Sequence, residues 1–191
     1  MQDKIYELIK LLTSFQNVEW GVVVPGSTRR ENDTEHSYNL AMVAWIIIEK
    51  DKLPLDVNLC LRYALVHDLV EVYAGDSFAL DPKQVAAKVE KELSAFKLIK
   101  ADDLTSSLAE YIQQYESMAN EEAKFIYSLD KLMPAFGVLY GSDLIWKNHD
   151  MSQLDWEEKF KAKIEASKFT RPYLEFVISE QKARPELFAA S

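Results

Sequence analysis

Two histidines and two aspartates stand where helical periodicity directs side chains inward: His36, His67, Asp68 and Asp130. Each lies on, or next to, an apolar stripe of a predicted helix. A carboxylate on an apolar face is costly to bury unless it is paired or bound to a metal. Two neutral imidazole nitrogens and two carboxylate oxygens suit a first-row divalent metal ion and leave positions open for water and a substrate oxygen. The four residues therefore predict a metal site assembled from three helices.

Three of these residues also have a purely structural interpretation. His36 could be a buried histidine bonded to the backbone, Asp68 an internal cap or half of an ion pair, and Asp130 the partner of Lys131 or of a distant arginine. Neighbouring side chains on a helix point apart, so we do not expect the pair between Asp130 and Lys131. The metal interpretation is favoured because one cation satisfies both acids and both rings.

The spacing of these residues resembles the H…HD…D signature of the HD-domain metal-dependent phosphohydrolases, and among them the HD-type 5'-deoxynucleotidases. The segment from Arg29 to Ser37 resembles the one that leads to their first metal ligand. The block from Val66 to Asp76 resembles their HD-x-x-E-x-x-x-G-D motif, and Asp130-Lys131-Leu132 resembles their closing D-K-L. The resemblance covers residues 5–140, approximately.

This resemblance implies a helical fold, one divalent metal ion and hydrolysis of a phosphomonoester such as a deoxynucleoside 5'-monophosphate. It implies that the metal is bound by His36, His67, Asp68 and Asp130. The ligand set does not choose among Mn, Co, Fe, Ni and Zn, because affinity order and metal availability both intervene. A bound divalent metal lowers the pKa of water toward about 7, which suits hydrolysis at neutral pH.

The resemblance also implies roles for Glu71, Asp76 and Arg29, and Glu31 and Trp20 are two further candidates for the site. Glu71 would hold or deprotonate a water, and Asp76 would contact the substrate or its leaving group. Arg29 would neutralise phosphate charge, Glu31 is a site acid or a solvated loop acid, and Trp20 would stack on a base or serve packing. The structural alternatives are a solvated helix position for Glu71, a turn position for Asp76 and a surface charge for Arg29.

Two other functions stay open. The chain could be an HD hydrolase of a guanosine polyphosphate, a cyclic nucleotide or a nucleoside triphosphate, or a non-catalytic HD-like signalling module. The net charge of −9 disfavours highly anionic substrates, and the presence of all four ligands favours an enzyme. His149 lies in a polar segment, where we expect no part in the site and assign no role.

The elements that must position these residues are predicted to be helical almost throughout. Asp33 or Thr34 should cap the helix that carries His36. The helix that begins at Asn120 should end near Pro134 and Gly137. Only residues 21–26 look extended, and they are too few to found a sheet.

Length and composition agree with one helical unit. The chain has 191 residues, of which 48% are hydrophobic, with only 5 Gly, 6 Pro and the single cysteine Cys60. We predict a single all-α domain over residues 1–191, an HD-type bundle of about seven or eight helices. Its motif-bearing core spans residues 5–140, approximately, and helices in 141–191 complete the bundle.

The same composition sets the expected partners. The acidic balance argues against a nucleic acid polymer, and the lack of an 18-residue apolar run argues against a membrane span. We expect a small nucleotide substrate, a cytoplasmic location and, from the family resemblance and the frequency of dimers among small enzymes, a homodimer.

Overall fold

The computed structural model describes residues 2–75, 82–141 and 144–189. Within these residues the chain forms ten α-helices, three short 3-10 helices and two strands. The elements are α1 (Gln2–Gln16), β1 (Glu19–Val23), β2 (Arg30–Asn32), α2 (Asp33–Asp51), α3 (Val57–Val66), α4 (Glu71–Ala74), α5 (Pro82–Ala101), η1 (Ser106–Leu108), α6 (Ala109–Glu116), α7 (Glu121–Tyr140), α8 (Ile145–Asn148), α9 (Gln153–Ile164), η2 (Lys168–Thr170), α10 (Arg171–Ala183) and η3 (Pro185–Leu187). Eight of the described α-helices have eight or more residues, so the predicted all-α fold is confirmed.

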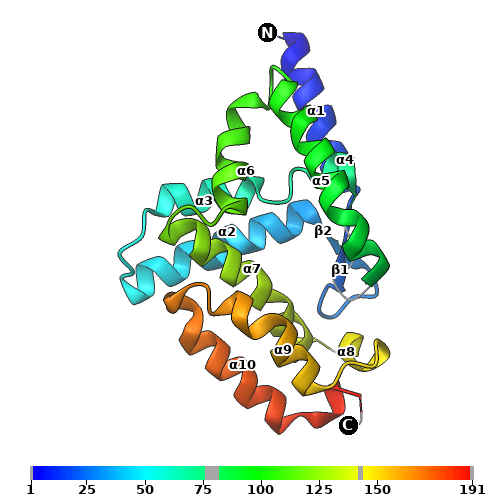
Figure 1. Cartoon of the computed structure of the whole chain (residues 1–191), viewed down its shortest axis with the longest axis vertical. Helices are drawn as coiled ribbons and strands as arrows, with labels where there is room; N and C mark the ends of the chain where they lie inside the picture. Colours follow the sequence, from blue (N-terminus) through cyan, green and yellow to red (C-terminus); the bar gives the residue numbers. More distant parts are fainter. Residues whose placement is uncertain (1, 76–81, 142–143, 190–191) are drawn as a thin grey trace.

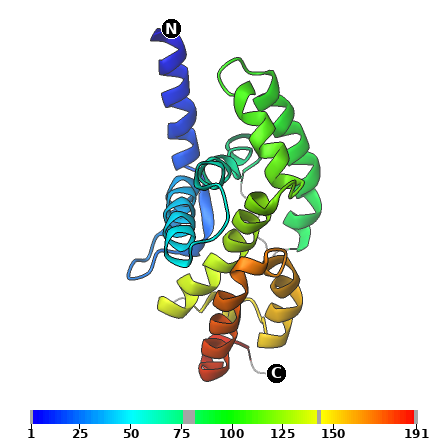
Figure 2. The ribbon, with the colours of Figure 1, turned by 90° about the vertical axis from the view of Figure 1, so that its left-hand side faces the viewer.

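The helix α7 lies at the centre of the arrangement and packs against α2, α3, α6, α9 and α10. The helices α1, α5 and α6 form one end of an elongated molecule, and α8, α9 and α10 form the other (Figure 1). Turned by 90°, α1 and α2 lie on one side and α5 and α6 on the other (Figure 2). The helix α7 can therefore contribute buried side chains both to the end with α6 and to the end with α9 and α10.

Two apolar clusters hold these helices. The larger is built from α2, α3, α7 and the C-terminal helices, and it includes Leu40, Tyr63 and Leu129. The smaller joins α1, α5 and α6 to the segment after α3; its buried members are Phe15, Val66, Leu69, Val70, Ala95, Ile99 and Ile112. The segment that contains His67 and Asp68 therefore has buried anchors on both sides.

The prediction that the extended segment founds no sheet was wrong. The strand β1 pairs with β2 in an antiparallel hairpin, in which Glu19 faces Asn32 and Val23 faces Arg30. The three residues of β2 are all polar and show no alternation of apolar and polar side chains, so the periodicity could not reveal the partner strand.

The cap of α2 also differs from the prediction. Asn32, and not Asp33 or Thr34, is the N-cap, and its side chain accepts a hydrogen bond from the Glu35 backbone N–H. The Glu35 carboxylate in turn accepts from the Asn32 backbone N–H, which completes a capping box. Asp33 is fully buried as the first residue of the helix.

The helix α7 continues through Pro134 to Tyr140, beyond the predicted end. A proline inside a helix removes its own N–H bond to the carbonyl four residues earlier, and its ring crowds that carbonyl, at a cost of about 3 kcal/mol. Buried Ala135 and Val138 hold the last turns against the core, so packing outweighs this loss.

Across the described ranges, we find no helix with the length and apolar character needed to cross a bilayer.

Candidate metal centre

The sequence suggested that His67 and Asp68 lie inside a helix. In the structure they lie in a turn between α3 and α4. The helix α3 ends at Val66, and His67 is its C-cap. Burial of Leu69 and Val70 in the smaller cluster anchors the turn. The backbone of His67 is still helical, with φ −58° and ψ −41°, and hydrogen bonds between residues three apart follow it. The side chains of His67 and Asp68 nevertheless meet, although neighbours on a helix start about 100° apart.

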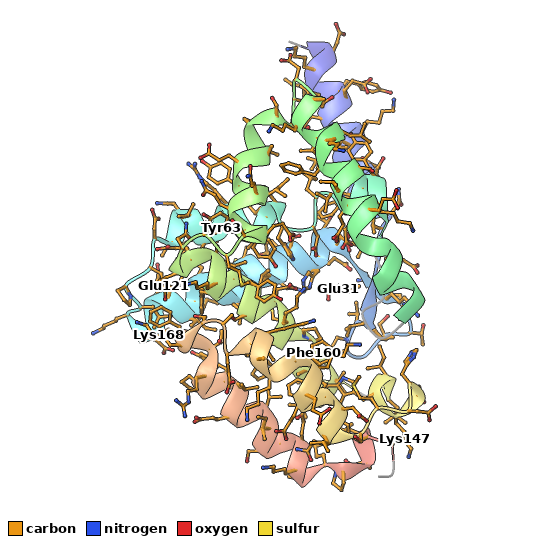
Figure 3. The ribbon with its side chains drawn as sticks, in the orientation of Figure 1. Glu31, Tyr63, Glu121, Lys147, Phe160 and Lys168 are labelled. Carbon is orange, nitrogen blue, oxygen red and sulfur yellow. The ribbon has the colours of Figure 1, made fainter. Side chains whose placement is uncertain are left out.

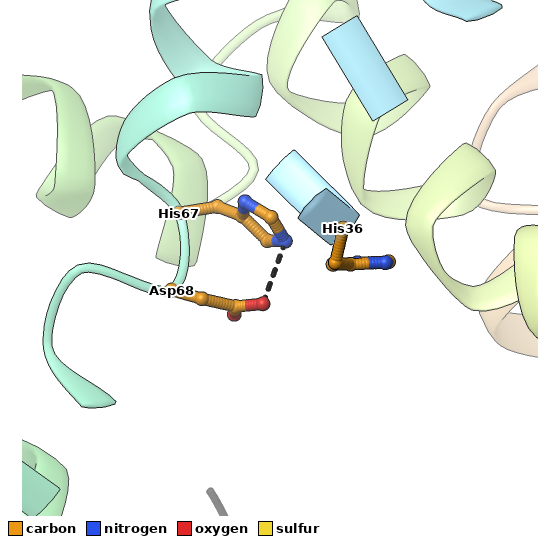
Figure 4. Close-up of side chains that lie close together, drawn as sticks. All are labelled: His36, His67 and Asp68. Carbon is orange, nitrogen blue, oxygen red and sulfur yellow. Dashed lines mark ion pairs between the residues drawn. The ribbon is translucent and has the colours of Figure 1, made fainter. Parts of the chain in front are cut away.

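The two imidazole rings approach each other at the centre of the fold. The ring centroids of His36 and His67 are 5.4 Å apart, and both side chains are buried. Nδ1 of His67 donates to the Ala64 carbonyl at 3.0 Å. This bond makes Nε2 the free nitrogen of the neutral ring, and Nε2 lies 2.9 Å from Asp68 Oδ2 (Figure 4).

Asp130 of α7 reaches the same point from the other side. Its Oδ1 lies 3.0 Å from His36 Nε2 and 3.8 Å from His67 Nε2. Its Oδ2 accepts a hydrogen bond from the Tyr115 hydroxyl at 3.1 Å. One oxygen therefore faces the two rings, and the other is held from behind.

The ion pair between Asp130 and Lys131, which we did not expect, is present. Lys131 Nζ lies 2.7 Å from Asp130 Oδ2. Adjacent residues do diverge at Cβ on a helix, but the long flexible stem of a lysine lets its ammonium group fold back. The structural interpretation of Asp130 is thus correct for one of its oxygens, and the other remains directed at the histidines.

These charges act strongly on one another because the site is buried. Burial lowers the pKa of His67, but Asp68 and Asp130 outweigh it and raise that pKa well above the ordinary value. Burial raises the pKa of Asp130, but Lys131 and the two histidines outweigh it and lower that pKa well below the ordinary value. The two carboxylates thus make this a place that favours positive charge.

The donor set fits one divalent metal ion. Ligand atoms of His36, His67 and Asp68 all lie within 4.8 Å of one another, and Asp130 Oδ1 contacts both rings. In the neutral ring of His67, the lone pair of Nε2 faces two carboxylates, an arrangement that is repulsive unless a cation or a proton lies between them. Nitrogen and oxygen ligands in this mixture suit first-row divalent metals.

Of the two predicted catalytic acids, Glu71 and Asp76, the structure describes only Glu71. Glu71 is the first residue of α4, and its side chain is only 3% exposed, which excludes a solvated helix position. Its backbone N–H donates to the Asp68 carbonyl at 2.8 Å, so its position is coupled to that of a predicted ligand. Asp76 lies outside the described residues.

The predicted substrate residues lie on and beside the hairpin. Arg29 forms two hydrogen bonds with the Glu35 carboxylate, at 2.6 and 2.8 Å, so its charge is already partnered. Glu31, labelled in Figure 3, accepts a hydrogen bond from the Asn39 side chain at 2.7 Å. Its Oε2 lies 3.9 Å from His36 Nδ1. Trp20 is part of β1, and its side chain does not belong to the part of the chain that the structure describes.

A cavity of about 770 Å³ opens beside His36, between the hairpin, α2 and α7. Its lining is mostly apolar, with Arg29, Glu31 and Glu35 as the charged residues. Ligand pockets commonly have this size and this mixture of apolar walls with a few polar groups. The cavity was not foreseen because its walls come from residues 22–47, residues 129–140 and Tyr173, which lie far apart in the sequence.

Sequence reasoning also missed Tyr115, the buried residue that contacts Asp130. Tyr115 belongs to the apolar stripe of a predicted helix, where an aromatic residue ordinarily serves packing. The sequence carries no signal that its hydroxyl would meet a carboxylate. Only the packing of α6 against α7 brings the two groups together.

Comparison with known proteins agrees with this geometry. The chain is 29% identical over 184 residues to the 5'-deoxynucleotidase HDDC2 of Homo sapiens, which covers 94% of this chain and 85% of that relative. It is 34% identical over 114 residues to the 5'-deoxynucleotidase HDDC2 of Mus musculus, which covers 58% of this chain and 56% of the relative.

A solved structure is similar along nearly its whole length. It is the crystal structure of a predicted metal-dependent phosphohydrolase from Magnetospirillum magnetotacticum MS-1, with a TM-score of 0.83 and 27% identity, covering 99% of this chain and 96% of that one. Residues 18–169 match the HD domain family. Because this match includes His36, the His67-Asp68 pair and Asp130, and most of the chain around them, the chain belongs to the HD domain family.

Proposed function

We propose that this protein is a metal-dependent phosphohydrolase that releases phosphate from deoxynucleoside 5'-monophosphates. The observation that carries the proposal is the convergence of buried His36, His67 and Asp130 with half-buried Asp68 in an HD domain. The similarity to a human 5'-deoxynucleotidase over 94% of the chain supports the choice of substrate class.

In this proposal the two histidines, Asp68 and Asp130 hold one divalent metal ion. When bound, the ion would act as a Lewis acid that polarises a phosphate oxygen and acidifies water. Glu71 would orient the attacking water and take its proton, since a buried acid next to the ligand turn is well placed for general base catalysis. Asp76 would serve the substrate side by contacting the leaving group.

The cavity beside His36 supports a place for the nucleoside. Its apolar walls suit a base and a sugar that lacks one hydroxyl group, and Trp20 remains a candidate for base stacking. Arg29 and Glu31 contribute the charged part of the lining. Because Arg29 is paired with Glu35, it would contact phosphate either through the N–H groups that this pair leaves or by exchanging the Glu35 carboxylate for the phosphate.

The test is phosphate release by apo protein reconstituted separately with Mn, Co, Fe, Ni or Zn. Substrates should include 2'-deoxy and ribonucleoside 5'-monophosphates, triphosphates, a cyclic nucleotide and a guanosine polyphosphate, with His67→Ala as the inactive control. We expect release from the deoxynucleoside monophosphates with at least one metal. Release only from a polyphosphate or a cyclic nucleotide would contradict the substrate class, and no release with bound metal would contradict the reaction.

We further propose that the protein is a single-domain homodimer that acts in the cytoplasm. Support for the dimer comes from α2, where the large apolar side chains Tyr38, Trp45 and Ile46 are exposed. Light scattering should then give twice the chain mass of 22.0 kDa. Ile46→Glu should yield monomers, whereas Glu158→Gln, an exposed change on α9, should not; a monomeric wild type would contradict the dimer.

A further inference from the structure

Tyr115 contacts two residues of the proposed metal site, Asp130 and His67. Its hydroxyl donates to Asp130 Oδ2 at 3.1 Å. Its ring meets the ring of His67 edge to face, with centroids 5.4 Å apart and planes inclined at 69°. The side chain is 4% exposed, so it has little freedom to take another position.

The helix α6 keeps this side chain in place. It packs against α3 and α7, the helices next to His67 and under Asp130. Ile112, one turn earlier, is buried in the smaller apolar cluster. Tyr115 is therefore held by the fold itself, independently of the groups it touches.

A carboxylate ligand needs such support because its two oxygens can exchange by rotation. With Oδ2 held by the phenol, Oδ1 stays directed at the histidines, 3.0 Å from His36 Nε2. The contact with the ring likewise limits rotation of His67. Partners behind the ligands commonly change metal affinity about 10- to 100-fold.

We propose that Tyr115 is a positioning residue of the metal site, which fixes the orientation of Asp130 through its hydroxyl and that of His67 through its ring. It touches neither the metal nor the substrate. The inference rests on the metal site proposed above and assigns part of its affinity to α6.

Lys131 shares Asp130 Oδ2 with Tyr115 and must be distinguished from it. Its ammonium group lies 2.7 Å from that oxygen, but its side chain is 34% exposed, whereas Tyr115 is 4% exposed. As a positive charge it also repels a divalent cation, whereas a phenol does not. Loss of Lys131 should therefore leave metal affinity unchanged or raise it, and loss of the Tyr115 hydroxyl should lower it.

The experiment measures binding of cobalt(II) and manganese(II) to the chelator-treated full chain by calorimetry. The variants are Tyr115→Phe, Lys131→Met and Tyr111→Phe. Tyr111 is the matched control, since it lies one turn away on α6 and its hydroxyl contacts Arg62 rather than the metal site. Circular dichroism and thermal unfolding of each apo protein check the fold.

We expect Tyr115→Phe to weaken binding of both metals about 10- to 100-fold and to alter the visible spectrum of the cobalt-saturated protein. Tyr111→Phe should change neither. Unchanged affinity and an unchanged spectrum in Tyr115→Phe would overturn the inference, as would an equal loss in both tyrosine variants. A loss in Lys131→Met without one in Tyr115→Phe would assign the positioning role to the lysine instead.

A wild-type protein that binds neither metal would instead show that the proposed metal site is wrong. If the Tyr115→Phe apo protein unfolds at a much lower temperature, the cobalt spectrum at saturation still decides the question. A merely structural tyrosine leaves the coordination geometry of the bound metal unchanged.

Discussion

At the scale of single residues, the site is a balance of buried charge. Asp68 and Asp130 bring two carboxylates to the rings of His36 and His67, and Lys131 compensates part of that charge. Burial makes each charge expensive unless it has a partner of opposite sign. A divalent cation between the rings and the carboxylates would provide that partner for all four side chains.

Replacement of Asp68 by Asn tests this balance with almost no change in shape. The substitution removes one negative charge and one oxygen ligand, so we expect metal affinity to fall by more than about 100-fold and phosphate release to be lost. Calorimetry and a phosphate assay measure the two effects. Glu158→Gln removes an exposed charge on α9 and should change neither, and a fully active, metal-free Asp68→Asn protein would rule out the mechanism.

At the scale of elements, the hairpin and α2 form one unit that places His36. Asn32 ends β2, where it pairs with Glu19 of β1, and it caps α2. His36 follows one turn later, so the register of the hairpin sets the position of the first predicted ligand. Glu35 links the two elements because its carboxylate binds both the Asn32 backbone and Arg29.

The contacts of Glu35 with Arg29 and with the Asn32 backbone predict that the stability of the fold depends on pH. The hydrogen bond from Arg29 lowers the pKa of Glu35 from its ordinary value of 4.5, although burial opposes the shift. A lowered pKa means that the Glu35 charge stabilises the fold above the unfolded-state pKa, and that this stabilisation is lost as the pH falls through the folded-state pKa. Because the pair is partly exposed, the contribution is small, about 0.5 kcal/mol.

Glu35→Gln should therefore be less stable than wild type at pH 7 by about 0.5 kcal/mol in the free energy of unfolding. The difference should shrink below pH 4.5 and vanish at lower pH. Urea unfolding at several pH values measures it. The Glu158→Gln control should show no such convergence, and a difference that grows on acidification would contradict the assignment.

At the scale of the whole molecule, the proposed metal ligands come from α2, from the turn after α3 and from α7. His36 and Asp130 are 94 residues apart in the chain. An ion that binds all three segments binds only the folded chain, because the unfolded chain does not hold them together. Metal binding should therefore stabilise the complete fold.

Addition of manganese(II) or cobalt(II) at about 100 times its dissociation constant should raise the free energy of unfolding by about 2.7 kcal/mol. For a chain of this length the unfolding temperature should rise by about 5–10 °C. Scanning calorimetry with and without a chelator measures the shift. Asp68→Asn should show almost none, and an equal shift in both proteins would indicate that the metal binds elsewhere.

The sequence by itself determined the helical class and pointed to the residue types of the candidate site. Apolar residues at helical spacing are a local property, and histidines and aspartates on such stripes stand out because burying them is costly. Because these patterns are local, the sequence did not reveal β2, the Asn32 cap or the continuation of α7 past Pro134. At these places pairing and packing outweigh local preference. Only the tertiary structure decided that Tyr115 and Lys131 share one oxygen of Asp130, since side-chain contacts between helices depend on how those helices pack and not on their periodicity.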